Sequence, residues 1–266
     1  METKSAKAWA QTLHEARIHS KPIAQLTQQL GPLKDQLTRP MAYEIQFLQR
    51  GLREAAGEKT VGFKMGLTSE AKRRQMNLDA PLYGVLTDQM QVTPGQVFHL
   101  KGLIHSKVEP EIAFVTKKDL SGVISREEAL AACGGVCAAL EILDSRYEQF
   151  KYFSMEDVIA DNSSSSHFVL GPWLQDFSQM DLLNLPMKMF VNDRLAQQGV
   201  SKDISGDPVV SIVQLCELLA ASNQILPAGS IVLAGAATVA EELQPGMQIS
   251  LTVDGLPPVQ FQVAGT

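Results

Sequence analysis

Two glutamates flank a proline in the stretch Lys107-Val108-Glu109-Pro110-Glu111-Ile112-Ala113-Phe114-Val115, and the apolar residues after them predict a strand buried on at least one face. Side chains i and i+2 of a strand point to the same side, so Glu109 and Glu111 should project together near the core. Paired buried carboxylates repel each other and resist desolvation, which bound magnesium, manganese or calcium would relieve. An exposed strand edge with two solvated charges explains the spacing equally well.

Composition excludes several classes of protein. The chain has 266 residues, of which 45% are hydrophobic and 20% charged, as in ordinary globular proteins. A net charge of −6 gives no basic surface, so nucleic acid is not an expected partner. No apolar run reaches membrane-spanning length, and the first residues are not those of a secretory signal. Cys133, Cys137 and Cys216 suit neither zinc nor a disulfide framework, so we expect a cytoplasmic protein.

The pattern of residues changes after the first 57. Residues 5–19 and 38–56 predict two helices, with Pro40 near the start of the second. The remainder predicts short strands, at residues 61–65, 83–86, 96–100, 108–115, 136–143, 167–170, 187–191, 230–234, 248–253 and 259–263. We therefore divide the chain into a helical N-terminal region, 1–57, and a β-rich catalytic body, 58–266, that forms a single structural unit.

A few helices and one turn interrupt these strands. Ser125-Arg126-Glu127-Glu128 is a capping box for a helix that should end at Gly134-Gly135. Asp207-Pro208 opens a helix to about Asn223, residues 154–160 predict another, and Asp254-Gly255 predicts a turn. The strand count favours an α+β fold with a mixed, rolled sheet.

Two further ionisable side chains fall in apolar segments. Glu141 lies within a strand-like run and would need a partner there, which could be a metal shared with Glu109 and Glu111, or else Arg146 or a lysine. Lys64, in an apolar strand that ends in glycine, either reaches the surface or enters a cleft. The residues alone leave both alternatives open.

Two small-residue segments could bind anionic oxygens. Asp161-Asn162-Ser163-Ser164-Ser165-Ser166 precedes an apolar strand, and Gly235-Ala236-Ala237-Thr238 follows one. A solvated loop is the ordinary interpretation of such a serine run. His105 is near the acidic pair and is more often a structural histidine than a ligand. No nucleophilic triad, phosphate loop or dinucleotide fingerprint is present in the sequence.

Several blocks taken together resemble the hydratase/decarboxylase branch of the fumarylacetoacetate hydrolase superfamily. The resemblance is collinear from about residue 38 to the last residue. Its blocks are Gly62-Phe63-Lys64-Met65-Gly66-Leu67-Thr68-Ser69, Ala80-Pro81-Leu82-Tyr83-Gly84, Ile104-His105-Ser106-Lys107-Val108-Glu109-Pro110-Glu111-Ile112, Glu141-Ile142-Leu143-Asp144-Ser145-Arg146-Tyr147 and Ala160-Asp161-Asn162-Ser163-Ser164. It implies the rolled sheet of the fumarylacetoacetate hydrolase C-terminal domain.

The resemblance also implies roles for individual residues. Mg²⁺ or Mn²⁺ would be held by Glu109, Glu111 and Glu141, and Lys64 would lie near the substrate. Asp88 corresponds only loosely to a catalytic acid. Substrate-binding positions are Leu82, Ser163, Ser164 and Thr238. Pro110 stands where relatives often have alanine, and because it has no N–H, its strand should be an edge or contain a bulge.

The implied reaction is metal-dependent decarboxylation of 2-oxo-3-hexenedioate to 2-hydroxypenta-2,4-dienoate and CO₂, in meta-cleavage catabolism of aromatic compounds. The alternative is hydration of 2-hydroxypenta-2,4-dienoate at the same metal. A different class would be a catalytically idle binding or scaffold protein, which the presence of all three glutamates disfavours. The resemblance further implies a homo-oligomer and an association with the hydratase of the pathway.

Overall fold

A computed structural model describes residues 5–68, 80–150 and 154–265. The α-helices are α1 (Ala6–His19), α2 (Leu26–Leu30), α3 (Arg39–Ala55), α5 (Arg126–Ala132), α6 (Met155–Ala160) and α7 (Pro208–Ala220). The strands are β1 (Thr60–Gly66), β2 (Leu82–Thr87), β3 (Gln91–Val92), β4 (Val97–Phe98), β5 (Lys107–Thr116), β6 (Cys133–Leu143), β7 (Ser165–Leu170), β8 (Pro186–Val191), β9 (Arg194–Val200), β10 (Ile231–Ala236), β11 (Glu241–Glu242), β12 (Gln248–Val253) and β13 (Leu256–Val263). Four short 3₁₀ helices, η1 (Gly31–Gln36), η2 (Asp88–Met90), η3 (Asn162–Ser164) and η4 (Ser201–Asp203), complete the assignment for these residues.

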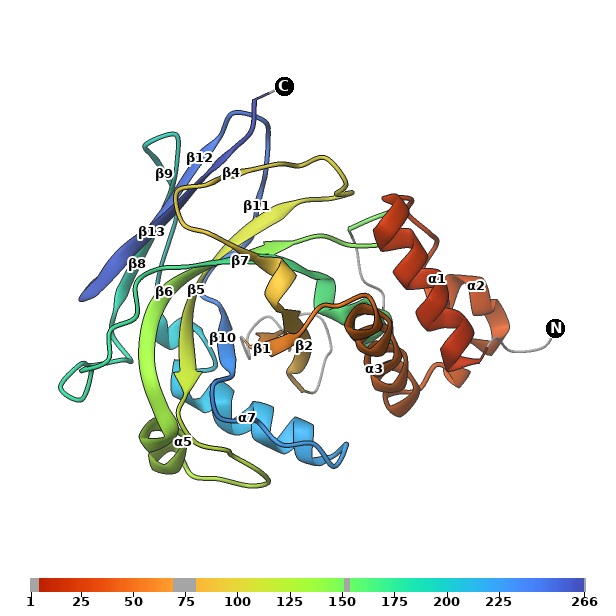
Figure 1. The fold of residues 1–266 in the computed structure, drawn as a ribbon, viewed down its shortest axis with the longest axis horizontal. Coiled ribbons are helices and arrows are strands. Elements are labelled where there is room, and N and C mark those ends of the chain that lie inside the picture. The colour runs from red at the N-terminus through yellow and green to blue at the C-terminus, as the bar shows by residue number, and fades with distance from the viewer. Residues whose placement is uncertain (1–4, 69–79, 151–153, 266) are drawn as a thin grey trace.

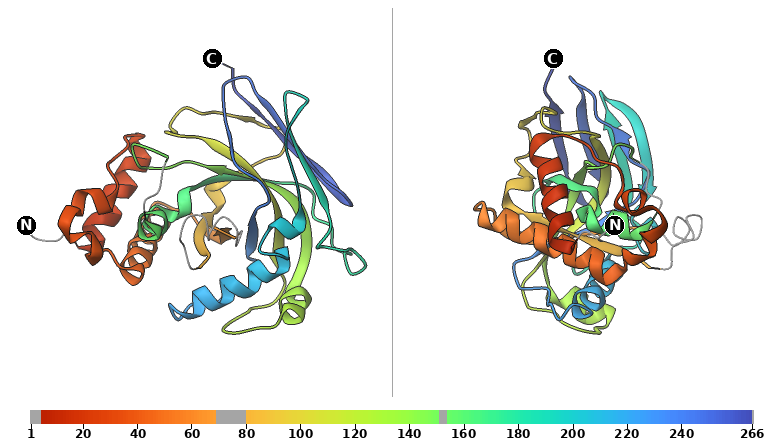
Figure 2. Two further views of the ribbon diagram at one scale, coloured as in Figure 1. Left: turned by 180° about the vertical axis from the view of Figure 1, so that it is seen from behind. Right: turned by 90° about the vertical axis from the view of Figure 1, so that its right-hand side faces the viewer.

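The strands form two sheets that curl around one side of the molecule (Figure 1). The larger runs β2-β1-β10-β5-β6-β7-β3, with β11 beside β5, and the smaller runs β4-β13-β12-β8-β9. Parallel pairs such as β1–β10 occur beside antiparallel pairs such as β5–β6, so the larger sheet is mixed. Figures 1 and 2 show α1, α2 and α3 gathered at one end of the molecule, and the rolled α+β prediction is confirmed.

The two longest strands, β5 and β6, form the middle of the larger sheet. Both are buried along most of their length, because both of their faces are covered by other parts of the fold. Their register places Glu109 opposite Glu141, and Lys107 opposite Leu143. This register brings acidic residues from two distant parts of the sequence together.

Most of the predicted elements are confirmed, and three differ from the prediction. The predicted strand 96–100 shrinks to β4. The strand β9 was not predicted, because Arg194-Leu195-Ala196-Gln197-Gln198 is polar and this strand lies at the edge of its sheet, largely open to solvent. The helix α5 ends at Ala132, and Gly134-Gly135 already belongs to β6 rather than ending the helix.

Pro110 lies in an interior strand, so the edge interpretation is wrong, and the irregular pairing near it belongs to the neighbouring strand rather than to its own. The pairing of β5 with β10 shifts register between Leu233 and Ala236, which pair with Ala113 and Glu111, so the extra residue lies on β10. The carbonyl oxygen of Pro110 accepts a hydrogen bond from Ala237 N at 3.2 Å. Since the N and O of one strand residue point to the same side, the missing N–H faces this irregular stretch of the sheet.

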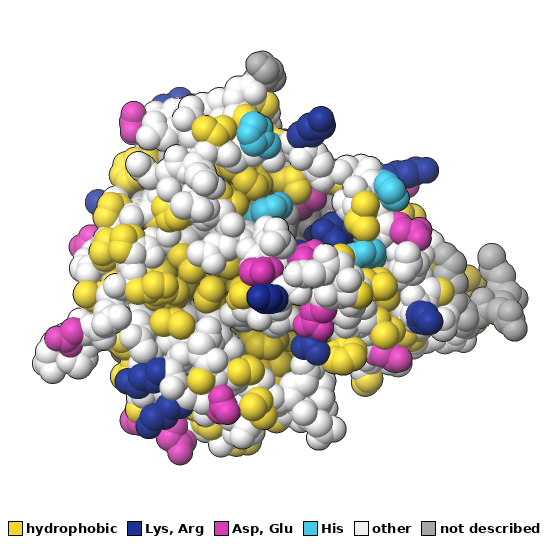
Figure 3. Space-filling model, in the orientation of Figure 1, with side chains coloured by type: hydrophobic (Ala, Val, Ile, Leu, Met, Phe, Trp, Pro, Cys, Tyr) yellow, Lys and Arg dark blue, Asp and Glu magenta, His cyan; other side chains and the backbone are white. Residues whose placement is uncertain are grey.

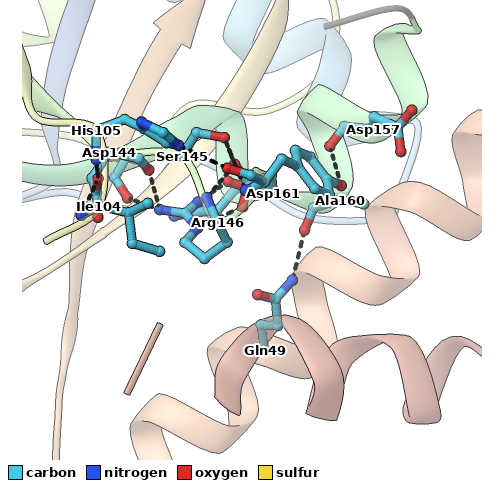
Figure 4. Close-up of polar contacts among 12 residues, drawn as sticks. Gln49, Ile104, His105, Asp144, Ser145, Arg146, Asp157, Ala160 and Asp161 are labelled. Carbon is cyan, nitrogen blue, oxygen red and sulfur yellow. Dashed lines mark hydrogen bonds and ion pairs between the residues drawn. The ribbon is translucent and has the colours of Figure 1, made fainter. Parts of the chain in front are cut away.

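The N-terminal helices attach to the body through buried polar bonds as well as apolar contacts. From α3, Gln46 Nε2 donates to Tyr83 O at 2.9 Å, and Gln49 Nε2 donates to Ala160 O at 2.6 Å. Figure 4 shows Gln49 reaching from its helix toward Ala160. Within the described ranges, no helix combines the length and apolar character needed to cross a membrane.

Candidate metal centre and active site

Three glutamates converge on the same side of the β5–β6 pair. One carboxylate oxygen from each of Glu109, Glu111 and Glu141 lies within 4.8 Å of the other two. Glu111 and Glu141 are fully buried, while Glu109 is partly exposed. All-oxygen, carboxylate-rich sites of this kind suit hard divalent cations such as Mg²⁺.

Lys64 of β1 enters the same cluster rather than reaching the surface. Its Nζ lies 3.0 Å from Glu141 Oε1 and 3.1 Å from Oε2, and only 4% of its side chain is exposed. The lysine therefore supplies the partner that a buried Glu141 requires, as one of the alternatives drawn from the sequence expects. It neutralises one of the three acids and leaves the other two facing each other.

Glu111 has the least compensated charge of the three. Its Oε2 accepts the backbone N–H of Gly235 at 2.9 Å, whereas its buried Oε1 has no hydrogen-bond partner among the described residues. Burial, reinforced by the charge of Glu141, raises the pKa of Glu111 well above its ordinary value. An acceptor without a donor in a site of net negative charge fits a bound cation.

A cavity opens beside the three acids. It is lined by Lys64, Met65, Gly66, Leu67, Thr68, Glu109, Leu143, Phe150, Val158, Ser163, Ser164, Ala236 and Ala240. On the face shown in Figure 3, acidic and basic side chains gather around a hollow near the centre of the molecule. Apolar walls with a few charged groups are typical of a site for a small organic acid.

A left-handed turn presents two serines to this cavity. Asn162, Ser163 and Ser164 have φ values of 48°, 54° and 55°, in the region that non-glycine residues seldom occupy. Asn162 offsets this strain by bonding both backbone groups of Val85, accepting from N at 2.8 Å and donating to O at 3.0 Å. Ser164 Oγ is buried and has no hydrogen-bond partner in the described structure, so it can donate to a ligand.

A buried ion pair holds Asp161, the residue directly before this turn. Arg146 Nε lies 2.5 Å from Asp161 Oδ1, and Arg146 also donates to Asp144 O at 2.6 Å and Ser165 O at 3.2 Å. Figure 4 shows this guanidinium between Asp144 and Asp161. Arg146 therefore pairs with Asp161, not with Glu141.

Three residues that the resemblance suggested do not line the cavity. Leu82 is fully buried in the core between the N-terminal helices and the body. Thr238 is buried, and its Oγ1 donates to Val239 O at 3.1 Å. Asp88 lies beyond the far end of β2, where its Oδ1 accepts from the backbone N–H groups of Lys59 and Gln89, both at 2.9 Å. Their assigned roles stay predictions without support from this geometry.

Some residues of the site were not expected from the sequence. Thr68 and Phe150 line the cavity, and the Gly235 N–H binds Glu111. Thr68 belongs to one of the blocks that carry the family resemblance, and Gly235 to a segment expected to bind anionic oxygens, so local signals exist for both. For Phe150 the sequence has no such local signal. Its position depends on tertiary packing, which periodicity does not report.

A rolled mixed sheet that presents a cluster of buried carboxylates to an open cavity defines a metal-dependent enzyme. The chain belongs to the fumarylacetoacetate hydrolase C-terminal family, which matches residues 51–264. It is 42% identical over 256 residues to a 4-oxalocrotonate decarboxylase of a Pseudomonas species, covering 96% of this chain and 97% of that protein. It is 34% identical to a 2-hydroxyhexa-2,4-dienoate hydratase of Comamonas testosteroni, covering 92% of each.

A solved structure shows the same architecture. The 4-oxalocrotonate decarboxylase from Pseudomonas putida G7, complexed with magnesium and adipate, superposes with a TM-score of 0.92 at 34% identity. The match covers 99% of this chain and 100% of that one. The fold is therefore shared over the full length, including the N-terminal helices.

Proposed function

We propose that this protein is a carboxy-lyase that converts 2-oxo-3-hexenedioate (4-oxalocrotonate) to 2-hydroxypenta-2,4-dienoate and CO₂ with Mg²⁺ or Mn²⁺. The observation that carries the proposal is the cluster of Glu109, Glu111 and Glu141 beside a cavity, in a chain 42% identical to a named 4-oxalocrotonate decarboxylase. The three glutamates hold the metal. When bound there, the cation supplies Lewis-acid stabilisation of negative charge that develops on the substrate.

The other cavity residues bind and orient the substrate. Ser164 Oγ, a buried hydroxyl without an internal partner among the described residues, donates to a carboxylate oxygen, with Ser163 beside it. Gly66 permits this arrangement, because a Cβ at its position would lie 2.7 Å from Ser163 Oγ. Lys64, whose Nζ lies 3.0 Å from Glu141 Oε1, holds or delivers a proton at the 2-oxo oxygen.

Decarboxylation of this substrate needs an electron sink. The bond between C5 and C6 breaks, CO₂ leaves, and its electron pair passes through the alkene to the 2-oxo oxygen. Protonation of that oxygen, for which Lys64 is positioned, gives 2-hydroxypenta-2,4-dienoate. Positive charge preorganised where the negative charge develops lowers the barrier.

The second candidate is hydration of 2-hydroxypenta-2,4-dienoate. It is favoured by the 34% identity to a hydratase and would use the same acids and cavity. The two reactions differ in whether the substrate carries a second carboxylate.

Assembly and location belong to the same proposal. We infer a cytoplasmic homo-oligomer that can associate with the hydratase of the pathway for aromatic catabolism. Leu195 of β9 and Val97 of β4, on the two edges of the smaller sheet, are 49% and 50% exposed and could contribute to a subunit interface. Light scattering of the purified protein tests the oligomer, and a monomer at micromolar concentration would contradict it.

The deciding experiment is an ultraviolet assay of the Mg²⁺ form with each substrate separately. Release of CO₂ from 2-oxo-3-hexenedioate supports the decarboxylase. Consumption of 2-hydroxypenta-2,4-dienoate alone would replace it with the hydratase. The variants E109Q and E141Q should be inactive in either assay, and normal turnover by them after chelator treatment would contradict the metal assignment.

A further inference from the structure

A second cavity adjoins the one beside the three acids. It is lined by Leu100, Leu103, Ile104, His105, Ser106, Lys107, Phe150, Glu242, Leu243, Gln244 and Pro245. Phe150 lines both cavities, so the two meet at this ring. His105 and Lys107 are the basic side chains of this second cavity.

The strand β5 relates this lysine directly to the metal centre. Lys107, Glu109 and Glu111 stand at positions i, i+2 and i+4, and therefore on one face of the strand. Directly opposite Lys107 on β6 is Leu143, which itself lines the cavity beside the acids. The Cα atoms of Lys107 and Glu109 are separated by two strand residues, or about 7 Å.

The ammonium group of Lys107 makes no ion pair with any residue that the structure describes. Its Nζ lies 4.2 Å from the centroid of the Phe150 ring, and the described part of the chain offers it neither an ion pair nor a hydrogen bond. Glu242 is its neighbour across the β5–β11 pair, but the Oε1 of that glutamate accepts from Gln244 Nε2 at 3.0 Å. A partly buried ammonium held over an aromatic face, without a counter-ion, suits an anionic ligand.

We propose, resting on the decarboxylase assignment, that the second cavity is the subsite for the distal carboxylate of the substrate and that Lys107 binds it. The five C–C bonds between C1 and C6, each about 1.5 Å, span about 6 Å in an extended zig-zag. This length is close to the spacing of about 7 Å between the Cα atoms of Lys107 and Glu109, so it suits a dicarboxylate that has its 2-oxo acid end at the three glutamates and its other end beside Lys107. A monocarboxylic dienoate has no group for this subsite.

The position of Lys107 predicts a particular kinetic signature. The lysine stabilises the carboxylate before CO₂ leaves, while the negative charge of the transition state moves toward the 2-oxo oxygen. Its removal should therefore weaken substrate binding and leave kcat little changed or raised. A hydrogen bond to a charged group has a strength that corresponds to about a 10- to 100-fold change in affinity, so we expect KM to rise by at least about 10-fold.

The test compares K107M, K107R and the control K101M, which removes an exposed lysine outside this cavity, all with Mg²⁺ bound. We measure KM for 2-oxo-3-hexenedioate and the inhibition constants of adipate, which spans both ends, and oxalate, which engages only the metal end. K107M should raise the inhibition constant of adipate by at least about 10-fold and that of oxalate by less than about 2-fold. K107R should give intermediate inhibition constants, and K101M should give those of the parent protein. Equal weakening of both inhibitors, or unchanged adipate binding, overturns the proposal.

The same variants separate this proposal from the proposed function. If the parent protein releases no CO₂ from 2-oxo-3-hexenedioate, the decarboxylase assignment falls. Calorimetry of adipate and oxalate binding then still reports on the subsite. Selective loss of adipate affinity in K107M supports the subsite regardless of turnover, and its absence rejects the subsite even in an active decarboxylase.

Discussion

Glu111 carries the strongest conflict between burial and charge in the candidate site. Its carboxylate is fully buried beside Glu141, and its pKa is raised by desolvation and by that neighbouring charge. At neutral pH the metal-free fold must either ionise this buried carboxyl or keep it protonated, and both cost free energy because its pKa in the unfolded chain is ordinary. A bound cation removes the conflict, and so does a neutral side chain.

We therefore expect E111Q to have opposite effects on stability and on metal binding. Without metal, the variant should unfold with a free energy at least about 1 kcal/mol higher than the parent, since each pKa unit is worth about 1.4 kcal/mol. Its Mg²⁺ affinity should fall by about 100-fold, because a ligand oxygen is lost. Urea unfolding and calorimetry with Mg²⁺ measure the two quantities. The exposed Glu148 supplies the control E148Q, and a metal-free E111Q less stable than the parent would contradict the argument.

His167 offers a prediction that does not involve the metal. Burial, aided by the charges of Arg53 and Arg17, lowers the pKa of His167 to about 4. Between pH 4 and the ordinary value of about 6.5, the unfolded chain binds more protons, so stability falls as the pH drops through this range.

The variant H167N should remove this part of the acid sensitivity. The difference in unfolding free energy between parent and variant should change by up to about 3 kcal/mol between pH 7 and pH 4. Denaturant unfolding at a series of pH values measures it, with H99N at an exposed histidine as the control. Parallel stability curves for the parent and H167N would show that the imidazole does not titrate in this way.

At the scale of the element, the last residues of β10 make both a backbone hydrogen bond and a tight contact. Gly235 has a φ of 114°, and a Cβ there would lie 2.5 Å from two atoms of the Thr68 side chain. Gly229 has a φ of 82°, but a Cβ on that residue would meet nothing within 4 Å. A substitution at Gly229 therefore measures the cost of the left-handed backbone without any steric contact.

We expect G229A to cost about 1–2 kcal/mol from its left-handed backbone alone. G235A should cost at least about 1 kcal/mol more, because Thr68 must also move. Since the Gly235 N–H binds Glu111, G235A should weaken Mg²⁺ binding while G229A does not. Thermal unfolding and metal titration distinguish the two variants, and equal behaviour would contradict a specific role for the contact with Thr68.

The sequence predicts features that depend on local patterns better than contacts that depend on the placement of distant strands. Alternation along β5 and the apolar setting of Glu141 are local signals, so the order of residues makes the three glutamates candidates, and the family resemblance assigned them to a metal. The contact of Lys64 with Glu141 depends on the placement of β1, which is separated from β6 by β10 and β5 across the sheet, and local patterns do not contain that placement. Leu82 and Asp88 were suggested by the resemblance, and Thr238 also by its place in a small-residue segment after a strand, but none of them lines the cavity.

At the scale of the whole molecule, the N-terminal helices complete the core of the body. Trp9, Leu13 and Ile45 are almost fully buried in one cluster with Tyr147 and Ile159. Each such side chain contributes about 1.5–3 kcal/mol when buried. We propose that residues 1–57 and 58–266 form one cooperative unit.

Expression of 58–266 alone should therefore give a protein without a cooperative thermal transition. The variant Q49A, which removes the side-chain hydrogen bonds to Ala160 O and Ile45 O, should keep a single transition and lose about 1–2 kcal/mol. Calorimetry and circular dichroism of both proteins test this. A stable, cooperatively folded 58–266, or two separate transitions in the full chain, would show that the regions are independent domains.

The lysine in the acidic cluster has a consequence for how the protein acquires its metal. Because Lys64 Nζ lies against Glu141, one of the three carboxylates has a cation from the chain itself. The charge that a divalent ion must balance is therefore mainly that of Glu109 and Glu111. We expect the ion to bind to strands that are already paired, so that metal uptake is a late step that leaves the fold unchanged.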